Sequence, residues 1–457
     1  MTKVTGFKLN GREVTLAGTD PTQSLLRWLK SQRLTGTKEG CADGDCGACT
    51  VALVETGADG AAHYQAVNSC LLPMGFLPGR DVLTVEALAD GPALHPVQQA
   101  MVDCAGSQCG YCTPGFVMSL FAGYYAREFD DGVTEGNLCR CTGYRPIRAA
   151  AAQLSATAQH EDRFRAQLGK PHEPLPPAEM AQFYSPINVE TALELKAAHP
   201  QAVWIAGATD TGVALSHGQT VASAFIALDR IAGFDRIEIG DEKVRLGAGV
   251  TLHALETQLA GVYPAFDQLI PWFAARQVRN RATLGGNLGS ASPIGDLLPV
   301  LLALEAHVVL RSLRGERRIA IDRYFLDYRK TERADDELIV AVELPRRVPG
   351  INASYKVAKR QTDDISIVAA VFVIERDAQA RVTYARLAFG GVAAIPLRAK
   401  NTEEFLIGKI LDADVVSETA TRLQQEFAPL SDHRASASYR RELCGGLFAK
   451  FVAEYLP

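Results

Sequence analysis

The chain has 457 residues, of which 47% are hydrophobic and 22% are charged, and this length predicts two or three domains with a sizeable core. Its formal net charge of -5 argues against nucleic acid or an anionic membrane as a partner, because binding to phosphates needs clustered positive charge. The N-terminus has no apolar core behind its basic residue, and no stretch of about 18 apolar residues occurs, so we expect a soluble cytoplasmic protein.

The first 90 residues predict a small α+β domain. Strand-like runs occupy residues 4–9 and 13–16. Leucines at helical spacing predict a helix over residues 24–33.

Residues 91–166 predict a helical domain. Pro96 suits the first turn of a helix, and much of the sequence from there to Ala126 has helical character. A further helix is expected after Arg145.

Residues 167–182 predict a linker, because four prolines within residues 171–177 cannot continue a helix or a central strand. Strand and helix patterns alternate again in residues 183–345, where glycine-rich turns occur. Residues 346–457 form a last module of strands and helices. The fold class expected for the whole chain is therefore multidomain α+β.

Nine of the ten cysteines lie within the first 141 residues. Thiols stay reduced in a cytosolic chain without a signal peptide, so clustered cysteines bind metal more often than they form disulfides. The two that stand apart from the motifs below, Cys104 and Cys444, are expected to be small buried residues without a chemical role.

The first cysteine set has the spacing C-x4-C-x2-C with a fourth cysteine twenty-one residues further on, and consists of Cys41, Cys46, Cys49 and Cys70. This is the spacing of plant-type [2Fe-2S] ferredoxins. Glycines at positions 40, 44 and 47 let the loop curl round a cluster and offer amide donors to its sulfurs. Two alternatives remain open: four buried structural thiols, and a zinc site, which more often has two separated C-x2-4-C pairs.

The second set combines C-x2-C with C-x-C and consists of Cys109, Cys112, Cys139 and Cys141. Four thiolates without a nearby histidine suit either an iron–sulfur cluster or zinc. The predicted helices place these cysteines near helix ends.

Three segments around these cysteines resemble the iron–sulfur signatures of the molybdenum hydroxylases of the xanthine oxidase family. They are TGTKEGCADGDCGACTV (residues 35–51), GSQCGYCTPGF (106–116) and GNLCRCTGYRPI (136–147). The resemblance implies a β-grasp ferredoxin domain over residues 1–90 and a four-helix domain over residues 91–166, each with one [2Fe-2S] cluster. It therefore favours iron over zinc at the second set.

Residues 183–345 resemble the flavin domain of the same family, which has the vanillyl-alcohol-oxidase fold and implies FAD as a third cofactor. No G-x-G-x-x-G follows a predicted strand, so a Rossmann site is not indicated. IAGATD (205–210) has Ala208 where the family often has a second glycine, yet the amides of residues 208–211 can cradle a pyrophosphate at a helix start. Taken singly, such glycines are also typical of ordinary turns.

The resemblance extends to TLGGN (283–287) and SPIGD (292–296), which match the segments that hold the ribityl and phosphate portions of FAD. Phe273 matches a position that packs on a cofactor ring. The FAD contacts implied by the resemblance are Ile205, Ala206, Gly207, Ala208, Thr209, Asp210, Thr211, Phe273, Thr283, Leu284, Gly285, Gly286, Asn287, Asp296, Val340 and Lys356.

Family members that oxidise xanthine bind molybdopterin in a large separate region, and residues 1–457 contain no such region. We therefore expect a molybdopterin-binding large subunit as partner, in a heterotetramer with two copies of each chain, as in bacterial xanthine dehydrogenases. Gln108 matches a family residue near the pterin and is expected to face that partner. No catalytic residue is expected on this chain.

The resemblance implies that electrons leave the partner's molybdenum centre, pass the Cys109 cluster and then the Cys41 cluster, reach FAD, and leave as hydride to NAD. The leading hypothesis is thus the electron-transfer, NAD-reducing subunit of a xanthine dehydrogenase. A second is the equivalent subunit of an enzyme for aldehydes, N-heterocycles or acyl-CoA. A third is a non-catalytic electron carrier or a zinc-binding interaction module. The partner sets the substrate, so residues 1–457 do not specify it.

Overall fold

The computed structural model describes residues 6–57, 60–157, 161–360 and 362–456, which form two compact units. Unit 1 consists of Met1–Ala232 together with the short segment Ala275–Ala282. Unit 2 consists of Gly233–Ala274 and Thr283–Pro457. The expected flavin region, residues 183–345, therefore contributes to both units.

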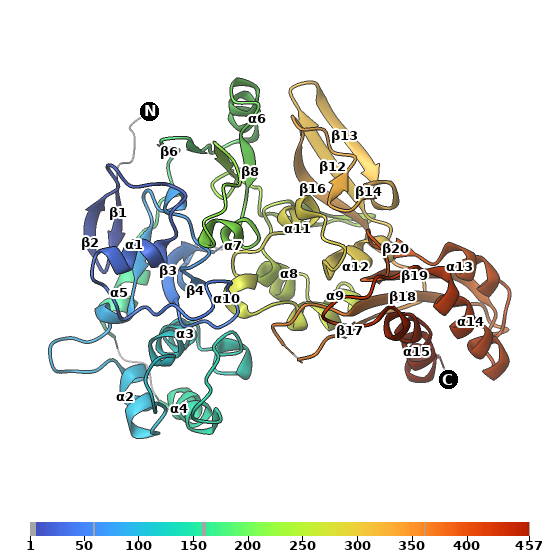
Figure 1. The fold of residues 1–457 in the computed structure, drawn as a ribbon, viewed down its shortest axis with the longest axis horizontal. Coiled ribbons are helices and arrows are strands. Elements are labelled where there is room, and N and C mark those ends of the chain that lie inside the picture. Colours follow the sequence, from blue (N-terminus) through green and yellow to red (C-terminus); the bar gives the residue numbers. More distant parts are fainter. Residues whose placement is uncertain (1–5, 58–59, 158–160, 361, 457) are drawn as a thin grey trace. The chain divides into compact units, whose positions relative to one another are not determined.

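Unit 1 begins with a five-stranded mixed sheet and one helix (Figure 1). Its elements are β1 (Gly6–Leu9), β2 (Arg12–Thr15), α1 (Leu25–Ser31), β3 (Thr50–Thr56), β4 (Ala62–Asn68), η1 (Met74–Phe76), β5 (Asp81–Leu83) and η2 (Val85–Ala87). The strand order is β2-β1-β5-β3-β4, with β1 and β5 parallel. The Ser24 hydroxyl caps α1, and Leu25 and Leu29 pack into the core beside Phe7. This is the expected α+β domain with its expected helix.

Four helices follow in unit 1: α2 (Pro96–Asp103), α3 (Thr113–Ala126), α4 (Arg145–Ala156) and α5 (Arg163–Leu168), with the turn η3 (Asp131–Val133). The helical character expected from Pro96 to Ala126 is interrupted, because residues 104–112 leave the helix between α2 and α3. Ala105 and Gly110 both have positive φ there, which ends a right-handed helix. The interruption carries Cys109 and presents Cys112 at the start of α3.

A small sheet completes the N-terminal part of unit 1. It consists of β6 (Ala178–Met180), β7 (Phe183–Ser185), β8 (Val203–Ile205) and β9 (Phe225–Ala227) in the order β6-β7-β9-β8, with helices α6 (Val189–Ala198) and α7 (Thr211–Ser216). The expected linker, residues 167–182, contains the end of α5 and all of β6, so residues 169–177 and 181–182 lie outside helices and strands. The last helix of unit 1 is α10 (Arg276–Arg279).

Unit 2 contains two larger antiparallel sheets and a two-stranded one. The first, in the order β10-β11-β16-β12-β13, consists of β10 (Ile237–Ile239), β11 (Lys243–Gly247), β12 (His307–Ser312), β13 (Gly315–Ala320) and β16 (Leu338–Pro345). Around it lie α8 (Leu252–Gln258), α9 (Pro264–Leu269), η4 (Ile270–Trp272), α11 (Leu284–Ser290), α12 (Leu297–Ala303), η5 (Ile321–Arg323) and the hairpin β14 (Phe325–Asp327) with β15 (Lys330–Thr331).

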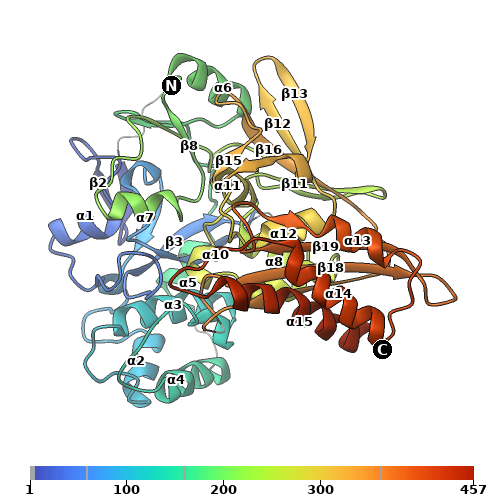
Figure 2. The same ribbon diagram turned by 45° about the vertical axis from the view of Figure 1, so that its right-hand side comes forward.

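The second sheet of unit 2 consists of β17 (Ile351–Val357), β18 (Val368–Arg376), β19 (Val382–Gly390) and β20 (Leu397–Arg398), in that order. Three helices follow: α13 (Lys400–Leu406), α14 (Ala413–Glu426) and α15 (Ala437–Tyr455). Figure 2 shows α14 and α15 beside β18 and β19, and Phe448 and Phe451 of α15 pack on Phe372 of β18. The fold is multidomain α+β, as the sequence predicts. Within the described ranges, no helix has the length and apolar character needed to cross a bilayer.

A buried polar network stabilises the helical part of unit 1. His95 Nδ1 accepts a hydrogen bond from the Val97 amide at 3.2 Å, which caps α2. His95 Nε2 lies 2.9 Å from the Tyr125 hydroxyl, which donates to Asp162 Oδ2 at 2.5 Å. The neutral imidazole with its proton on Nε2 satisfies all three partners. Burial lowers the pKa of His95 to about 4.

The low pKa of His95 predicts a pH-dependent stability. The unfolded chain takes up a proton at His95 near pH 6.5, whereas the folded chain does so only near pH 4. The free energy of unfolding should therefore increase as pH rises through this window, by at most about 1.4 kcal/mol per pH unit. Denaturant unfolding between pH 5 and 7 measures this slope. His95→Asn keeps a capping acceptor without the titration and should flatten the curve, whereas His433→Asn, at an exposed histidine, should not.

Candidate functional site

The first cysteine set is arranged as two pairs. The Cys41 and Cys46 amides each donate to the sulfur of the other residue at 3.3 Å. The Cys49 and Cys70 sulfurs lie 3.4 Å apart, and both residues are buried. The Asp43 amide also donates to Cys41 Sγ at 3.3 Å. Backbone amides therefore already point at the sulfurs, as a cluster-binding loop requires.

The second set is also arranged as two pairs. The Cys109 and Cys141 sulfurs lie 3.6 Å apart, and both residues are exposed. Cys112 hydrogen-bonds through its thiol to buried Cys139. The amides of Cys141 and Thr142 donate to Cys139 Sγ, each at 3.4 Å. One edge of this set thus faces solvent while the other faces the core.

The pairing suits a binuclear cluster. A tetrahedral metal with metal–sulfur bonds of about 2.3 Å spaces two thiolates roughly 3.8 Å apart, close to the separations of 3.4 and 3.6 Å. Zinc needs four ligands around one ion, whereas each iron of a [2Fe-2S] cluster takes two thiolates. The four pairs therefore fit two [2Fe-2S] clusters.

Hydrogen bonds within each pair of the first set shift the pKa values of the two thiols in opposite directions. A hydrogen bond from the Cys41 thiol lowers the pKa of Cys46 to about 6 and raises the pKa of Cys41. In the same way, the hydrogen bond between Cys70 and Cys49 lowers the pKa of Cys49 and raises the pKa of Cys70. A metal that binds such a pair displaces the thiol proton, so its binding is coupled to proton release.

The two isolated cysteines lie in different surroundings. Cys104 ends α2 and is only partly buried, with its thiol 3.3 Å from Gln153 Oε1, so the full burial expected for it is not observed. Cys444 is buried in α15, and burial raises the pKa of its thiol to about 12. Such a thiol stays protonated and unreactive at neutral pH.

The predicted pyrophosphate loop of unit 1 connects β8 with α7. Ala208, where the family often has glycine, has a φ of 64°. This left-handed conformation costs an L-residue about 1 to 2 kcal/mol. A Cβ on Gly207 would lie 1.8 Å from the Arg281 carbonyl oxygen, so the backbone leaves no room for a side chain there. The remaining predicted contacts in this loop are Ile205, Ala206, Thr209, Asp210 and Thr211.

In unit 2, three of the predicted FAD contacts lie together. Lys356 Nζ donates to Asp296 Oδ2 at 2.7 Å and lies 5.9 Å from the centroid of the Phe273 ring. It also donates to the Trp272 carbonyl oxygen at 2.9 Å. Both charged side chains are at least 95% buried. Ser366 donates to the other oxygen of Asp296, a role that the sequence pattern does not reveal.

The TLGGN segment of unit 2 forms the start of α11. Thr283 Oγ1 accepts from the Gly286 amide at 3.0 Å, and the Gly285 amide donates to the Ala248 carbonyl oxygen. The Ala248 amide donates in turn to the Val340 carbonyl oxygen, which places Val340 beside this segment. Asn287 Oδ1 is buried and has no hydrogen-bond partner among the described residues. It is therefore an acceptor that a ligand hydroxyl can satisfy.

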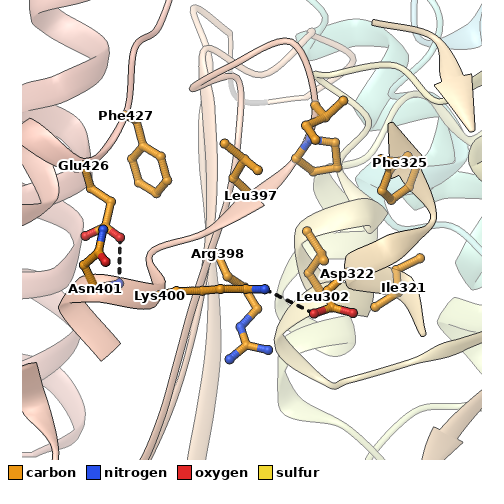
Figure 3. A pocket seen from close by; sticks show the side chains of 12 residues that line it. Leu302, Ile321, Asp322, Phe325, Leu397, Arg398, Lys400, Asn401, Glu426 and Phe427 are labelled. Atoms are coloured by element: carbon orange, nitrogen blue, oxygen red, sulfur yellow. Dashed lines mark hydrogen bonds and ion pairs between the residues drawn. The ribbon is translucent and has the colours of Figure 1, made fainter. Parts of the chain in front are cut away.

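A separate cavity of about 320 Å³ in unit 2 contains none of the predicted FAD contacts (Figure 3). Lys400 reaches Asp322 at 3.2 Å, and Glu426 accepts from the Asn401 amide at 2.9 Å. Arg398, which also lines the cavity, pairs with a glutamate of α13. The charges around this cavity are thus paired with protein groups.

Four family profiles match successive parts of the chain. They are the 2Fe-2S iron-sulfur cluster binding domain (residues 7–75), the [2Fe-2S] binding domain (84–152), the FAD binding domain in molybdopterin dehydrogenase (179–347) and the CO dehydrogenase flavoprotein C-terminal domain (353–455). The chain therefore contains two 2Fe-2S domains and an FAD-binding domain.

Curated relatives match nearly the whole chain. A xanthine dehydrogenase of Emericella nidulans is 32% identical over 98% of this chain and 38% of its own length. Xanthine dehydrogenase 1 of Arabidopsis thaliana is 31% identical over 94% of the chain, again 38% of its own length. The rat xanthine dehydrogenase/oxidase is 29% identical over 98% of the chain and 39% of its own length. The chain thus spans about two fifths of the length of these relatives.

Solved structures share the fold of part of the chain. A cyanide-inactivated Cu,Mo-CO dehydrogenase aligns with a TM-score of 0.57 and 25% identity, over 60% of this chain and 96% of that chain. Quinoline 2-oxidoreductase of Pseudomonas putida 86 aligns with the same TM-score at 23% identity, over 61% of this chain and 97% of that chain. At this identity the alignment shows a similar fold only.

Substitutions in the pyrophosphate loop should have opposite effects. Gly207→Ala forces a Cβ against the Arg281 carbonyl oxygen and should destabilise unit 1 by several kcal/mol. Ala208→Gly removes left-handed strain but adds freedom to the unfolded chain, so it should be neutral or stabilising by up to about 1 kcal/mol. Denaturant unfolding of both variants tests this. A clear loss of stability in Ala208→Gly would contradict the described backbone.

The cysteine pairs predict two independent clusters. The chain should contain about four irons and four acid-labile sulfides. Cys49→Ser should abolish one electron paramagnetic resonance (EPR) signal and leave the other, because the second set shares no ligand with the first. Cys104→Ser is the matched control and should keep both signals. Stoichiometric zinc in anaerobically purified protein would refute the assignment.

Proposed function

Because the chain belongs to the molybdenum hydroxylases, as their iron–sulfur and FAD portion, we propose that it is the electron-transfer, NAD-reducing subunit of a xanthine dehydrogenase. The observation that carries this proposal is the match of 94 to 98% of the chain to xanthine dehydrogenases of fungi, plants and animals. The fit of the four thiol pairs to two [2Fe-2S] clusters supports it independently.

The proposal includes a molybdopterin-binding partner. Part of this chain aligns with 96% of one chain of a CO dehydrogenase structure, and by analogy we assign substrate oxidation to a separate large subunit, with two copies of each chain in the assembly. The exposed edge of the second cysteine set, formed by Gln108, Cys109 and Cys141, is the proposed face toward this partner. A cluster that exchanges electrons with another chain has to lie close to the shared surface.

The bound cofactors would supply the redox chemistry, which is transfer of single electrons through the clusters and of hydride from FAD to NAD. This chain's residues bind and orient them. The thiol pairs hold iron, and the amides of Cys46 and Asp43 donate to the sulfurs. Lys356 holds the Asp296 carboxylate in a fixed position, so a flavin at Phe273 meets a preorganised polar group.

An equivalent subunit of another molybdenum hydroxylase is the second candidate. The likeness to a CO dehydrogenase structure at 25% identity favours it, since the same fold serves a different substrate there. Purine, aldehyde, N-heterocycle or acyl-CoA substrates would all be selected by the partner. The deciding experiment measures reduction of NAD by the complex of this chain with its partner, with xanthine or with an aldehyde as substrate. Reduction with xanthine supports the first candidate. Reduction with the aldehyde but not with xanthine favours the second.

The chain without its partner should still exchange hydride between NADH and FAD. NADH-driven reduction of an artificial dye by the FAD-loaded chain measures this activity, and xanthine should drive none. Asp296→Asn removes the charge that pairs with buried Lys356 and should weaken FAD retention at least tenfold, or about 1.4 kcal/mol. Cys112→Ser should spare the activity, because the dye can take electrons from the flavin directly.

The matched control for this experiment is Glu403→Gln. It breaks another buried ion pair of unit 2, with Arg398, at residues outside the predicted FAD contacts. It should lower stability without changing FAD retention. If a chain with bound, reducible FAD does not oxidise NADH, then NAD is not the electron acceptor. The proposal of an NAD-reducing dehydrogenase would then be replaced by that of an oxidase that passes electrons to oxygen or to a carrier.

A further inference from the structure

Three glycines from three different cysteine motifs meet within unit 1. A Cβ on Gly115 would lie 2.2 Å from the Gly47 carbonyl oxygen, and a Cβ on Gly47 would lie 2.2 Å from the Gly136 carbonyl oxygen. The loop of the first set, the start of α3 and the segment before Cys139 are therefore in direct backbone contact. Only residues without a side chain permit this approach.

One hydrogen bond at this contact connects the two cysteine sets. The Leu138 amide donates to the Cys46 carbonyl oxygen at 3.0 Å. Cys46 belongs to the first set, and Leu138 directly precedes Cys139 of the second. A path of covalent bonds with a single hydrogen bond thus runs from the Cys46 sulfur to the Cys139 sulfur.

Four buried polar side chains surround this bond, and Asn137 is at their centre. Its Nδ2 donates to the Gly47 carbonyl oxygen at 3.0 Å, and its Oδ1 accepts from Ser119 at 2.7 Å and from Gln277 at 3.1 Å. Thr50 Oγ1 donates to the same Gly47 oxygen at 2.6 Å. Each of the four side chains is at most 2% exposed. Gln277 Oε1 is buried and has no hydrogen-bond partner among the described residues, whereas both polar atoms of Asn137 are bonded, so a shift of Asn137 would leave buried polar groups unpaired.

Gln277 enters this network from a distant part of the sequence. It belongs to α10, in the short segment that joins unit 1, and its Nε2 also donates to Ser119 at 3.0 Å. The buried ion pair of Arg279 with Glu135 anchors the same segment at 2.5 Å. The network thus ties the first loop, α3, the segment before Cys139 and α10 into one rigid group.

We propose that Asn137 and Gln277 are positioning residues that fix the separation of the two cysteine sets and preserve the bond between Leu138 and Cys46. The inference rests on the proposed function, in which one electron leaves one cluster as the other gains it, without bond cleavage or proton transfer. The two amides touch neither set of sulfurs. Asn137 holds Gly47, and therefore Cys46, against the segment that carries Cys139, and Gln277 holds Asn137 in place.

The test uses the full chain with both clusters reduced by dithionite, and EPR spectroscopy as the readout. The wild-type chain should show two signals with mutual magnetic splitting, which falls steeply with distance. Asn137→Ala and Gln277→Met, the latter nearly isosteric, should keep both signals but lose the splitting. Asn280→Ala is the matched control: it removes a buried bond from the same segment, to the Ala66 carbonyl oxygen, and should keep the splitting.

The outcomes separate this inference from the proposed function. Two signals with unchanged splitting in Asn137→Ala or Gln277→Met would overturn the inference while leaving both clusters in place. Two wild-type signals without splitting would overturn it as well. A wild-type chain without two cluster signals would instead refute the proposed function. If Asn137→Ala does not fold, the Gln277→Met result alone decides, because methionine introduces no buried charge.

Discussion

The contact of three backbone segments at Gly47, Gly115 and Gly136 is the constraint on which the iron–sulfur part depends. Each segment carries cysteines on a loop, and loops are the mobile parts of most proteins. Here the loops gain rigidity from one another, because their carbonyl and amide groups meet without intervening side chains. The buried amides of Asn137 and Gln277 then complete hydrogen bonds that water cannot supply at this depth.

The predicted FAD contacts of unit 2 depend on a different principle. Asp296, Lys356 and Ser366 form a buried polar cluster in which the carboxylate accepts bonds at both oxygens. Burial of a charge is costly unless it is paired, and this pair is enclosed by β17, α12 and the turn before Phe273. The enclosure fixes the geometry before any ligand arrives, which reduces the entropy that binding must overcome.

The sequence predicts what depends on local spacing. Both cysteine sets could be predicted from their intervals, α1 from helical spacing and α2 from proline at its first turn. The break between α2 and α3 could not, because Ala105 adopts positive φ without being glycine. Ala208 is a similar case, where the backbone keeps the glycine-like conformation although the residue has changed. The roles of Ser366, Asn137 and Gln277 depend on partners 18 to 158 residues away, and no pattern within one segment contains that information.

The placement of Ala275–Ala282 in unit 1 has a consequence for synthesis on the ribosome. All eight cysteines of the two sets have been made by residue 141, yet Gln277 and Arg279 belong to the core beside them. Until residue 282 has emerged, Glu135 lacks its buried cation and Asn137 lacks one donor. Domains commonly fold in order as the chain emerges, but here a segment more than 130 residues downstream completes the N-terminal unit. The hydrogen bonds beside the two cysteine sets are therefore complete only once that later segment has been made.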